Sequence, residues 1–323
     1  MKTYNRIVYD HFDTDSPESV YEIEEAKLPD TLPDDRIQVR ILIAPIHPAD
    51  TTCATGAVTG IDFPCIAGVE ALGVIEKVGN NYTDQWQVGQ RVTVCSNYIF
   101  GNWVTWQGAW SQYLICPSEA LIAVPDGVSD ESAAQFMANP LSSFAYMKDI
   151  GIAPGNILLQ TAANSIFARM IIQYSRVYGF ETINLVRHSD RAEQLKSELN
   201  IDSVYVYDGS PESAEQVRTS IARDFSGRHI DYCIDPIGAE TASFCLSLLG
   251  PDGVLYIHGL LSGNVMLTIN AFHDILLKNN TLKGWSVQET WCRKKSDAEK
   301  RQTVAELWEL IVANKVHIPK TGE

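Results

Sequence analysis

The chain has few basic residues for its length. It holds 25 Lys and Arg against 40 Asp and Glu in 323 residues, a formal net charge of −15, and the charges are spread along the sequence. Binding to a phosphate backbone requires patches of Lys and Arg. We therefore expect no nucleic-acid partner.

Long apolar runs and closely spaced cysteines are also missing. No run of 18 apolar residues occurs, which predicts that no segment spans a membrane. The segment Met1–Asn5 lacks the apolar core of a signal peptide. The seven cysteines are widely separated, form no CxxC pair and mostly lie in apolar stretches. This pattern is typical of reduced, buried thiols, so we expect a cytoplasmic location.

Residues 1–125 are predicted to form a β-rich, barrel-like domain. Short segments rich in β-branched residues, such as Arg36–Ile43, Gly68–Val78 and Arg91–Cys95, are separated by Gly and Pro. Short strands at this regular spacing are typical of barrels and sandwiches.

Residues 126–323 are predicted to form a second domain of another class, because strands and helices alternate there. Ser129 is the expected cap of the first helix. Such alternation indicates a parallel, doubly wound sheet. The predicted strands are 156–160, 180–186, 203–207, 230–235, 253–258 and 281–285, and the predicted helices between them are 166–178, 189–199, 211–225 and 239–249.

The turn after the first predicted strand of this domain contains no glycine. Dinucleotide sites carry glycines here, since the backbone must approach the pyrophosphate at a helix N-terminus. This turn reads Thr-Ala-Ala-Asn-Ser over residues 161–165. Ala is small, Asn tolerates a left-handed backbone, and Asn164 and Ser165 can both donate hydrogen bonds to phosphate. We therefore expect the geometry to survive, with a Rossmann-shaped domain that no longer binds nucleotide as the alternative.

The second predicted strand ends in a basic turn. An Asp or Glu at this point would accept the ribose hydroxyls of NAD, whereas a cation suits the 2′-phosphate of NADP. The chain has Arg187, His188 and Ser189 here. We predict that Arg187 and Ser189 bind this phosphate, with Arg191 in reserve. The alternative is an ordinary basic surface turn.

Several motifs resemble those of a known family. They are Ile46–Asp50, Phe63–Pro64 with Gly68–Glu70 and Gly73–Gly79, Gly108–Tyr113, Asn139–Pro140 with Ala145–Tyr146, Gln160–Ser165 and Thr182–Arg187. With these motifs the chain resembles the zinc-independent medium-chain dehydrogenase/reductases, and most of all the mitochondrial-type 2-enoyl thioester reductases. The resemblance covers nearly all residues. It implies an α/β protein with a β-rich, GroES-like N-terminal domain and a doubly wound, parallel-sheet Rossmann domain that binds NADPH.

The resemblance also implies which residues contact the cofactor. One asparagine contacts the nicotinamide end, one turn holds the pyrophosphate, one loop holds the adenosine phosphate, and two loops lie on the nicotinamide side. The corresponding residues are Asn139; Asn164, Ser165, Ile166 and Phe167; Arg187, His188 and Ser189; Ile257, His258, Gly259 and Leu260; and Trp285, Ser286 and Val287.

A metal site is not expected. Relatives with catalytic zinc place a histidine just before the glutamate of a Gly-His-Glu motif, and Val69 occupies that position here. His47, Cys53 and Glu70 do not have the ligand pattern of catalytic zinc, which needs three ligands and an open position. The four-cysteine loop of structural zinc is absent too.

Two departures from the family bear on the reaction. The reductases carry a tyrosine that is thought to protonate or orient the thioester, and Val58 stands in its place. Tyr98, in an aromatic loop with Trp103, is the candidate substitute. Relatives also continue for a segment that returns to the first domain, and the sequence leads us to expect that this return segment is missing.

The sequence thus leaves three hypotheses for the function. The first is an NADPH-dependent enoyl thioester reductase that transfers hydride to the β carbon of an activated alkene, with nearby donors stabilising the enolate oxygen. Tyr98, Trp103 and Trp285 would line its apolar pocket. The second is a quinone, enal or enone reductase on the same scaffold. The third is a non-catalytic NADPH-binding or structural descendant. A homodimer is expected, because edge strands of such sheets often pair across a twofold axis.

Overall fold

The computed structural model describes residues 2–58, 60–95, 99–100, 108–264 and 266–319. The chain packs into two units, which we describe separately. The first contains residues 1–142, 292–314 and 318–323, and the second contains residues 143–291 and 315–317. The boundary predicted after residue 125 marks where the β-rich sequence pattern ends, and it stays a prediction.

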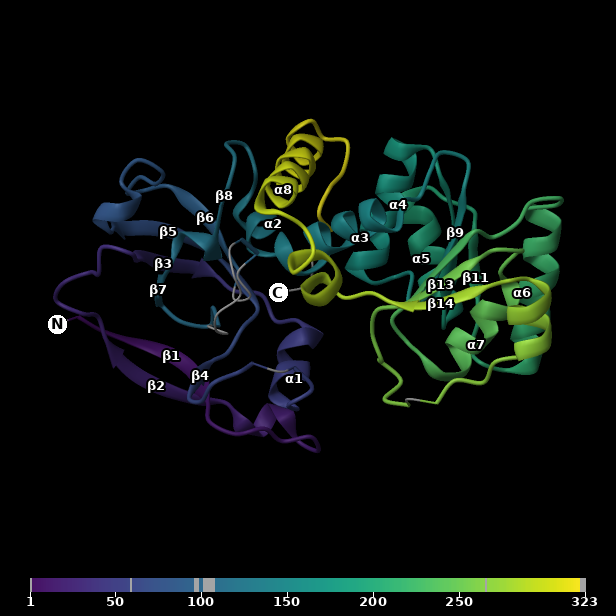
Figure 1. The fold of residues 1–323 in the computed structure, drawn as a ribbon, viewed down its shortest axis with the longest axis horizontal. Coiled ribbons are helices and arrows are strands. Elements are labelled where there is room, and N and C mark those ends of the chain that lie inside the picture. Colours follow the sequence, from purple (N-terminus) through teal and green to yellow (C-terminus); the bar gives the residue numbers. More distant parts are fainter. Residues whose placement is uncertain (1, 59, 96–98, 101–107, 265, 320–323) are drawn as a thin grey trace. The chain divides into compact units, whose positions relative to one another are not determined.

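The first unit is built on two antiparallel sheets (Figure 1). The smaller sheet has the order β2-β1-β4, and the larger has the order β7-β3-β5-β6-β8. Apolar side chains from the larger sheet, including Val39, Ile75 and Val92, are fully buried in one cluster. The predicted β-rich, GroES-like domain is therefore confirmed. The strands are β1 (Thr3–Tyr9), β2 (Glu22–Lys27), β3 (Ile37–Ile43), β4 (Cys65–Ile66), β5 (Glu70–Val78), β6 (Arg91–Cys95), β7 (Tyr113–Cys116) and β8 (Leu121–Ala123).

Short helices surround these sheets. Three of them are 3-10 turns: η1 (Pro17–Val20), η2 (Asn80–Tyr82) and η3 (Ser118–Ala120). The others are α1 (Pro48–Ala54), α2 (Asp130–Ala134) and the π-helical turn η4 (Met137–Leu141). The hydroxyl of Ser129 caps α2 as predicted, by accepting from the N–H of Ser132 at 3.2 Å.

A C-terminal helix belongs to the first unit although it follows the second in sequence. Helix α8 (Asp297–Val312) begins with a capping box between Ser296 and Glu299. Its Trp308 ring stacks on Phe136, with ring centroids 3.6 Å apart. The buried Lys300 ammonium donates to the carbonyl of Ile99 at 2.8 Å. Residues 292–314 therefore belong to the first unit, and residues 315–317 belong again to the second.

The second unit is a six-stranded parallel sheet. Its strands are ordered β11-β10-β9-β12-β13-β14, which in chain order is the 3-2-1-4-5-6 arrangement of a dinucleotide-binding fold. The predicted doubly wound Rossmann domain is thereby confirmed. The strands are β9 (Ile157–Gln160), β10 (Glu181–Val186), β11 (Val204–Val206), β12 (Tyr232–Asp235), β13 (Val254–Ile257) and β14 (Thr281–Gly284).

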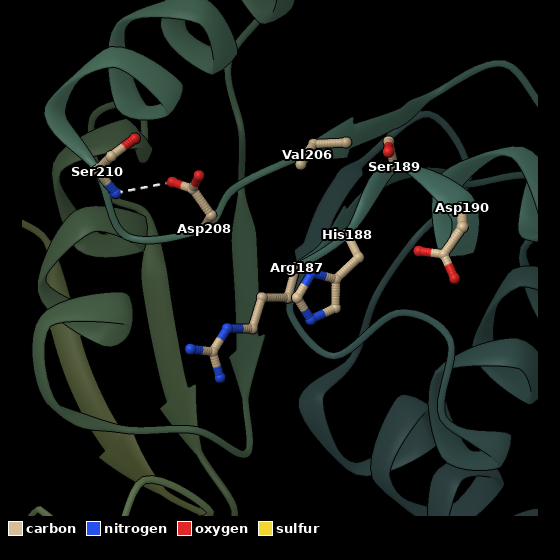
Figure 2. Close-up of a pocket in the computed structure, with 7 residues that line it drawn as sticks. All are labelled: Arg187, His188, Ser189, Asp190, Val206, Asp208 and Ser210. Carbon is tan, nitrogen blue, oxygen red and sulfur yellow. Dashed lines mark hydrogen bonds between the residues drawn. The ribbon is translucent and has the colours of Figure 1, made fainter.

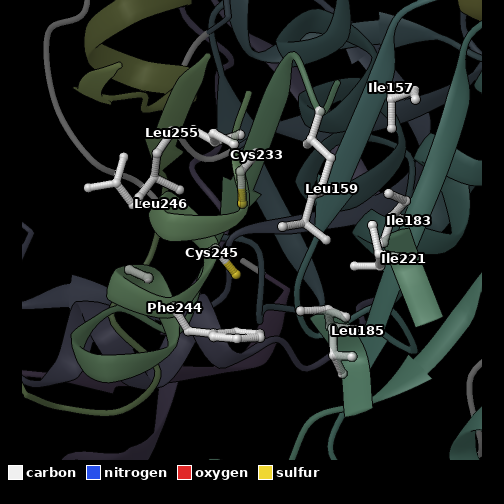
Figure 3. Close-up of a cluster of buried hydrophobic side chains, with 14 residues drawn as sticks. Ile157, Leu159, Ile183, Leu185, Ile221, Cys233, Phe244, Cys245, Leu246 and Leu255 are labelled. Atoms are coloured by element: carbon white, nitrogen blue, oxygen red, sulfur yellow. The ribbon is translucent and has the colours of Figure 1, made fainter. Parts of the chain in front are cut away.

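Helices cover both faces of this sheet. One face packs on α6 and α7 through a cluster that includes Leu159, Ile183 and Cys245 (Figure 3). The other packs on α4 and α5 through a cluster that includes Ile172, Val186 and Leu195. Along β10, Ile183 and Leu185 belong to the first cluster and Val186 belongs to the second, so the strand contributes apolar side chains to both faces of the sheet. The helices of this unit are α3 (Ser142–Ile150), α4 (Ile166–Tyr178), α5 (Ser189–Leu199), α6 (Pro211–Asp224), α7 (Ala239–Leu248), and the π-helical η5 (Ala271–Leu277) and η6 (Val287–Cys292).

Candidate functional site

The turn between β9 and α4 lies at the point where the strand order of the sheet reverses. Strand β9 has β10 on one side and β12 on the other, and the crevice beyond such a strand is where α/β sheets bind ligands. Ala162 takes the left-handed conformation, with φ of +48°, that a glycine would usually supply. Asn164 is exposed, and the hydroxyl of Ser165 accepts from the N–H of Ala168 at 3.3 Å. Ser165 is therefore a helix cap as well as a candidate ligand.

Buried polar side chains at the ends of β9, β10 and β12 stabilise this turn through hydrogen bonds. Gln160 donates to Asn184 at 2.6 Å and to the carbonyl of Ala168 at 3.1 Å, which ties the end of β9 to β10 and to the first turn of α4. Asp235, at the end of β12, accepts from the hydroxyl of Thr161 and, at 2.6 Å, from the N–H of Gly238. Burial raises the pKa of Asp235. These bonds fix the loops after β9 and β12 relative to β10, although the turn at residues 161–165 itself contains no glycine.

The turn leads directly into the N-terminus of α4. The leading N–H groups of a helix have no partner within the helix, and they carry the positive end of its dipole. Ile166 and Phe167 are the first two residues of α4 and are half-buried. The turn can therefore bind a pyrophosphate through its backbone, as the sequence predicts for residues 164–167.

A cavity of about 630 Å³ lies beyond the ends of β10 and β11 (Figure 2). Among the described residues, Arg187 has neither a hydrogen-bond partner nor an ion-pair partner, and its side chain is exposed. A partnerless guanidinium beside a cavity is suited to bind an anion. The lining residues are Arg187, His188, Ser189, Asp190, Val206, Asp208 and Ser210.

Two acidic residues of this cavity were not predicted as site residues. Hydrogen bonds from Ser213 and from Ser210 lower the pKa of Asp208 to about 2, so this carboxylate stays ionised. Asp190 lies in the same lining, 3.8 Å from the guanidinium of Arg191. Arg191 also donates to Gln194 at 3.0 Å and is not among the lining residues. Arg191, the reserve candidate for binding the 2′-phosphate, thus lies along α5, whereas Arg187 lines the cavity.

The loops expected on the nicotinamide side are joined by aromatic contacts. The ring of His258, just after β13, stacks on Phe167 with centroids 4.6 Å apart. Tyr146 of α3 packs edge-on against Trp285, with centroids 4.4 Å apart, and also contacts Phe167 and His258. The Trp285 indole is buried and donates to Asp149 at 2.9 Å. Tyr146 therefore connects three loops that the sequence assigned separately, although the sequence analysis gave it no role.

The other residues of these loops differ in how closely they are packed and how exposed they are. A Cβ on Gly259 would lie 2.8 Å from the carbonyl oxygen of Pro236, so the loops after β12 and β13 approach too closely for a side chain there. Ile257 is half-buried, and Leu260 is exposed. The N–H of Ser286 donates to Thr290 at 3.0 Å, and Val287 begins η6.

We predict that replacing His258 with glutamine removes part of the acid sensitivity of the fold. Burial lowers the pKa of His258 to about 4, so the folded state resists protonation while the unfolded state does not. Stability should then fall as the pH drops from about 6.5 towards 4, by about 1–2 kcal/mol for this residue, since it is only half-buried. Urea unfolding of both proteins at pH 5 and pH 7.5 measures this. An equal loss of stability on acidification in both would contradict it, and the exposed His188→Gln is the control.

The first unit brings together three of the motifs that carry the family resemblance. Asp50 accepts from the N–H of His47 at 2.6 Å and from that of Val69 at 2.9 Å. The buried Glu70 accepts from the N–H groups of Met137 and Ala138, at 2.6 and 3.2 Å. It therefore fixes the start of η4, the turn that carries the half-buried Asn139.

The remaining candidates lie in or near the first unit. Val58 is half-buried and packs in an apolar cluster with Cys53 and Val69, where it offers no proton. Tyr98 and Trp103 lie outside the described residues. In the part of the chain that the structure describes, no group of three His, Cys, Asp or Glu side chains could hold a metal ion. Within the same residues, no helix is long and apolar enough to cross a membrane.

Comparison with known families and curated proteins agrees with this architecture. Residues 33–126 match the alcohol dehydrogenase GroES-like domain, and residues 168–312 match the zinc-binding dehydrogenase family. A mitochondrial enoyl-[acyl-carrier-protein] reductase of Dictyostelium discoideum is 26% identical over 306 residues, which cover 92% of this chain and 81% of the relative. The protein of the same name from Arabidopsis thaliana is 28% identical, over 84% of this chain and 70% of the relative.

Solved structures share the fold. A candidate NADPH:quinone reductase from Bacillus thuringiensis superposes with a TM-score of 0.84 at 24% identity, covering 99% of this chain and 90% of that one. The complex of Etr1p with NADP and crotonyl-CoA gives 0.82 at 18% identity, covering 99% and 92%. The Etr1p/Etr2p heterodimer of Candida tropicalis gives 0.81 at 20% identity, covering 99% and 92%.

One expectation needs correction. The curated relatives are named as mitochondrial proteins, so the expected cytoplasmic location is wrong. The seven cysteines are all free, and free buried thiols argue only against an oxidising compartment. They do not distinguish the cytoplasm from other reducing compartments, and that is why the inference failed. On the two family matches and the order of its parallel strands, the chain belongs to the medium-chain dehydrogenase/reductase superfamily.

Proposed function

We propose that this protein is an NADPH-dependent reductase of activated carbon–carbon double bonds, with an enoyl thioester as its substrate. The observation that carries the proposal is the partnerless Arg187 at the cavity beyond β10, where an NAD-specific site would have an acidic residue. The Dictyostelium and Arabidopsis relatives are named enoyl reductases. A solved structural neighbour holds NADP and crotonyl-CoA.

The residues present suit this cofactor. Arg187 and Ser189 would hold the 2′-phosphate, and the N-terminal turn of α4 with Asn164 would hold the pyrophosphate. Asn139 and the loops that carry Ile257–Leu260 and Trp285–Val287 would contact the nicotinamide end, as the family resemblance implies. When bound, NADPH supplies the hydride and its electron pair. The chain's own contribution is to orient both reactants and to supply a proton.

The first test is the choice of coenzyme and substrate. Oxidation of NADPH and of NADH is followed at 340 nm with crotonyl-CoA and, separately, with a naphthoquinone. We expect turnover of crotonyl-CoA with NADPH at least tenfold faster than with NADH. Turnover of the naphthoquinone alone would favour the quinone reductase hypothesis, which the Bacillus thuringiensis neighbour supports. Tight NADPH binding without any turnover would favour the non-catalytic hypothesis.

We also propose that the protein is a homodimer that pairs through the β14 edge of the parallel sheet. Within the described residues, strand β14 pairs with β13 alone, and all four of its residues are exposed. Beside it in sequence, η5 exposes four large apolar residues, and apolar patches of this kind mark interaction surfaces. These residues are Phe272, Ile275, Leu276 and Leu277. A relative from Candida tropicalis is itself a heterodimer.

The double variant Phe272→Asp, Leu276→Asp is expected to be a monomer, because it places charges in the apolar patch. Size-exclusion chromatography with light scattering measures the mass, which is 35.8 kDa for one chain. The control is Ile23→Asp, which changes an equally exposed apolar residue on β2. A monomeric wild-type protein, or a double variant that stays dimeric, would refute this interface.

A further inference from the structure

The cavity beyond β10 and β11 is lined by charges of both signs. Its described lining contains the guanidinium of Arg187 and the carboxylates of Asp190 and Asp208. Asp190 lies 3.8 Å from the guanidinium of Arg191, which offsets part of its charge. Asp208 is exposed and has no ion-pair partner among the described residues. Within this lining, an incoming anion therefore meets the free cation of Arg187 and a carboxylate that no cation neutralises.

The pairing of two parallel strands brings this cation and this carboxylate to one cavity. Val186, the last residue of β10, pairs with Val206, the last residue of β11. Arg187 lies one residue past this pair, and Asp208 lies two residues past it. Sites specific for NAD have their acidic residue after the second strand of the sheet. This chain has a cation after the second strand, β10, and an acidic residue after the third strand, β11.

Local hydrogen bonds fix the Asp208 carboxylate and keep it ionised. It accepts from the N–H of Ser210 at 2.8 Å (Figure 2). The N–H of Asp208 donates to the hydroxyl of Ser213 at 3.3 Å. These contacts form the turn that leads into α6, whose N-terminal cap is Ser210. The effect of the charge of Asp208 must therefore be separated from the effect of this turn.

The charge of Asp208 acts on a coenzyme that carries a 2′-phosphate. A phosphate monoester has a charge of about −1.5 to −2 near pH 7, whereas the 2′-hydroxyl of NADH is uncharged. A carboxylate in the same cavity therefore repels the phosphate and has little effect on the hydroxyl. An unpaired charge placed against one ligand lowers its affinity relative to that of another, and so sets specificity. Arg187 and Asp208 thus act in opposite directions on the choice of coenzyme.

We propose that Asp208 is a specificity-determining residue, which limits the preference of this site for NADPH and retains NADH as a second coenzyme. The inference rests on the proposed function, because it takes the cavity as the site of the 2′-phosphate. Arg187 binds this phosphate, and Asp208 raises the Kd for NADPH by repulsion. The Kd for NADH depends on the rest of the site. The two Kd values are therefore closer together than Arg187 alone would make them.

The test is a titration of Asp208→Asn with NADPH and with NADH, followed by quenching of tryptophan fluorescence. Asparagine keeps a side-chain oxygen that can accept from Ser210, so the turn is retained while the charge is removed. The Kd for NADPH is expected to fall about three- to tenfold, and the Kd for NADH to stay within twofold. The control is Glu215→Gln, which removes the same charge from an exposed position of α6 outside the cavity lining. It should leave the ratio of the two Kd values unchanged.

Two further measurements separate the charge of Asp208 from its turn. The gain in NADPH affinity of Asp208→Asn should shrink when NaCl is raised from about 0.1 to 0.5 M, because salt screens charges in a cavity that is open to water. Asp208→Ala removes both the charge and the acceptor for Ser210. It should therefore shift the ratio of the Kd values as Asp208→Asn does, but unfold at a lower temperature than Asp208→Asn.

Three results would overturn this assignment. They are an unchanged Kd for NADPH in Asp208→Asn, an equal gain in Glu215→Gln, and a gain in Asp208→Ala alone, which would assign the effect to the turn. NADPH affinity that depends on Arg187 but not on Asp208 would refute this inference and leave the proposed function intact. A wild-type protein that does not bind NADPH, or an Arg187→Ala variant that binds it as tightly as wild type, would refute the proposed phosphate site and this role with it.

Discussion

Arg187→Ala is expected to weaken NADPH binding about 10- to 100-fold while the Kd for NADH changes less than threefold. The guanidinium is partnerless among the described residues and faces the cavity beyond β10, so its removal takes away the main positive charge available to the 2′-phosphate. A charge-assisted hydrogen bond is worth about 1.5–3 kcal/mol, and each 1.4 kcal/mol is a tenfold change in Kd. NADH lacks the 2′-phosphate and should not respond. Quenching of tryptophan fluorescence on titration with each coenzyme measures both constants.

Arg191→Ala is the matched control for this prediction. Arg191 is four residues further along the chain and carries the same charge, but it donates to Gln194 and lies near Asp190, outside the cavity lining. It changes the net charge by the same amount, so a general electrostatic effect would appear in both variants. If the two variants lose NADPH affinity equally, the cavity is not the phosphate site. If neither loses affinity, the cofactor is held elsewhere.

The parallel strands of the second unit and its helices α4 to α7 could be predicted from the sequence, whereas α3, η5 and η6 were not predicted. Its helices 166–178 and 189–199 have the predicted bounds, and its strands differ by a residue or two at their ends. Local patterns suffice here because the central strands β9, β10 and β12 are buried on both faces, and the helices that cover the sheet each have an apolar face. The right-handedness of the crossovers then limits the strand orders that are possible. For the same reason the turn at residues 161–165 could be located before its conformation was known.

Contacts between distant segments could not be predicted in this way. Tyr146 joins Phe167, His258 and Trp285, which are up to 139 positions away in sequence, and no local pattern marks such a contact. Asp208 lines the cavity beyond β10 because β11 pairs with β10. A rule was available for Asp208, since every parallel strand of this sheet ends at the same edge. Tyr146 had no comparable signal.

The first unit was predicted only as a class. Arg91–Cys95 is a strand as predicted, but β1, β2, β4, β7 and β8 were not identified individually, nor were α1 and α8. Antiparallel pairing joins segments far apart in sequence, such as β3 with β7. The same holds for the buried pair of His47 and Glu70. Each residue lay in a motif that the sequence analysis named, but their 2.7 Å approach depends on how α1 and β5 are brought together.

Gly68→Ala is expected to destabilise the first unit by about 2–5 kcal/mol, from backbone strain and overpacking together. Gly68 has φ of +95°, a conformation that side chains rarely adopt, and a Cβ there would lie 2.3 Å from the Trp110 ring. That ring is fixed, because its indole donates to the carbonyl of Pro45 at 3.0 Å. The strain falls directly before Val69 and Glu70, so the support of η4 should also loosen. Enoyl reductase activity should therefore fall more than NADPH affinity, whose proposed phosphate contacts lie in the second unit.

Gly89→Ala separates the two causes of this effect. Gly89 has nearly the same backbone conformation, with φ of +89°, but no atom lies within 4 Å of the Cβ position. Only the backbone strain remains, so the expected loss is about 1 kcal/mol. Thermal and urea unfolding, followed by circular dichroism, should place the midpoint of Gly68→Ala well below that of Gly89→Ala. Equal midpoints would mean that Trp110 moves aside at little cost, and the segment from Pro45 to Glu70 would then be too pliable to hold His47 and Glu70 at a fixed distance.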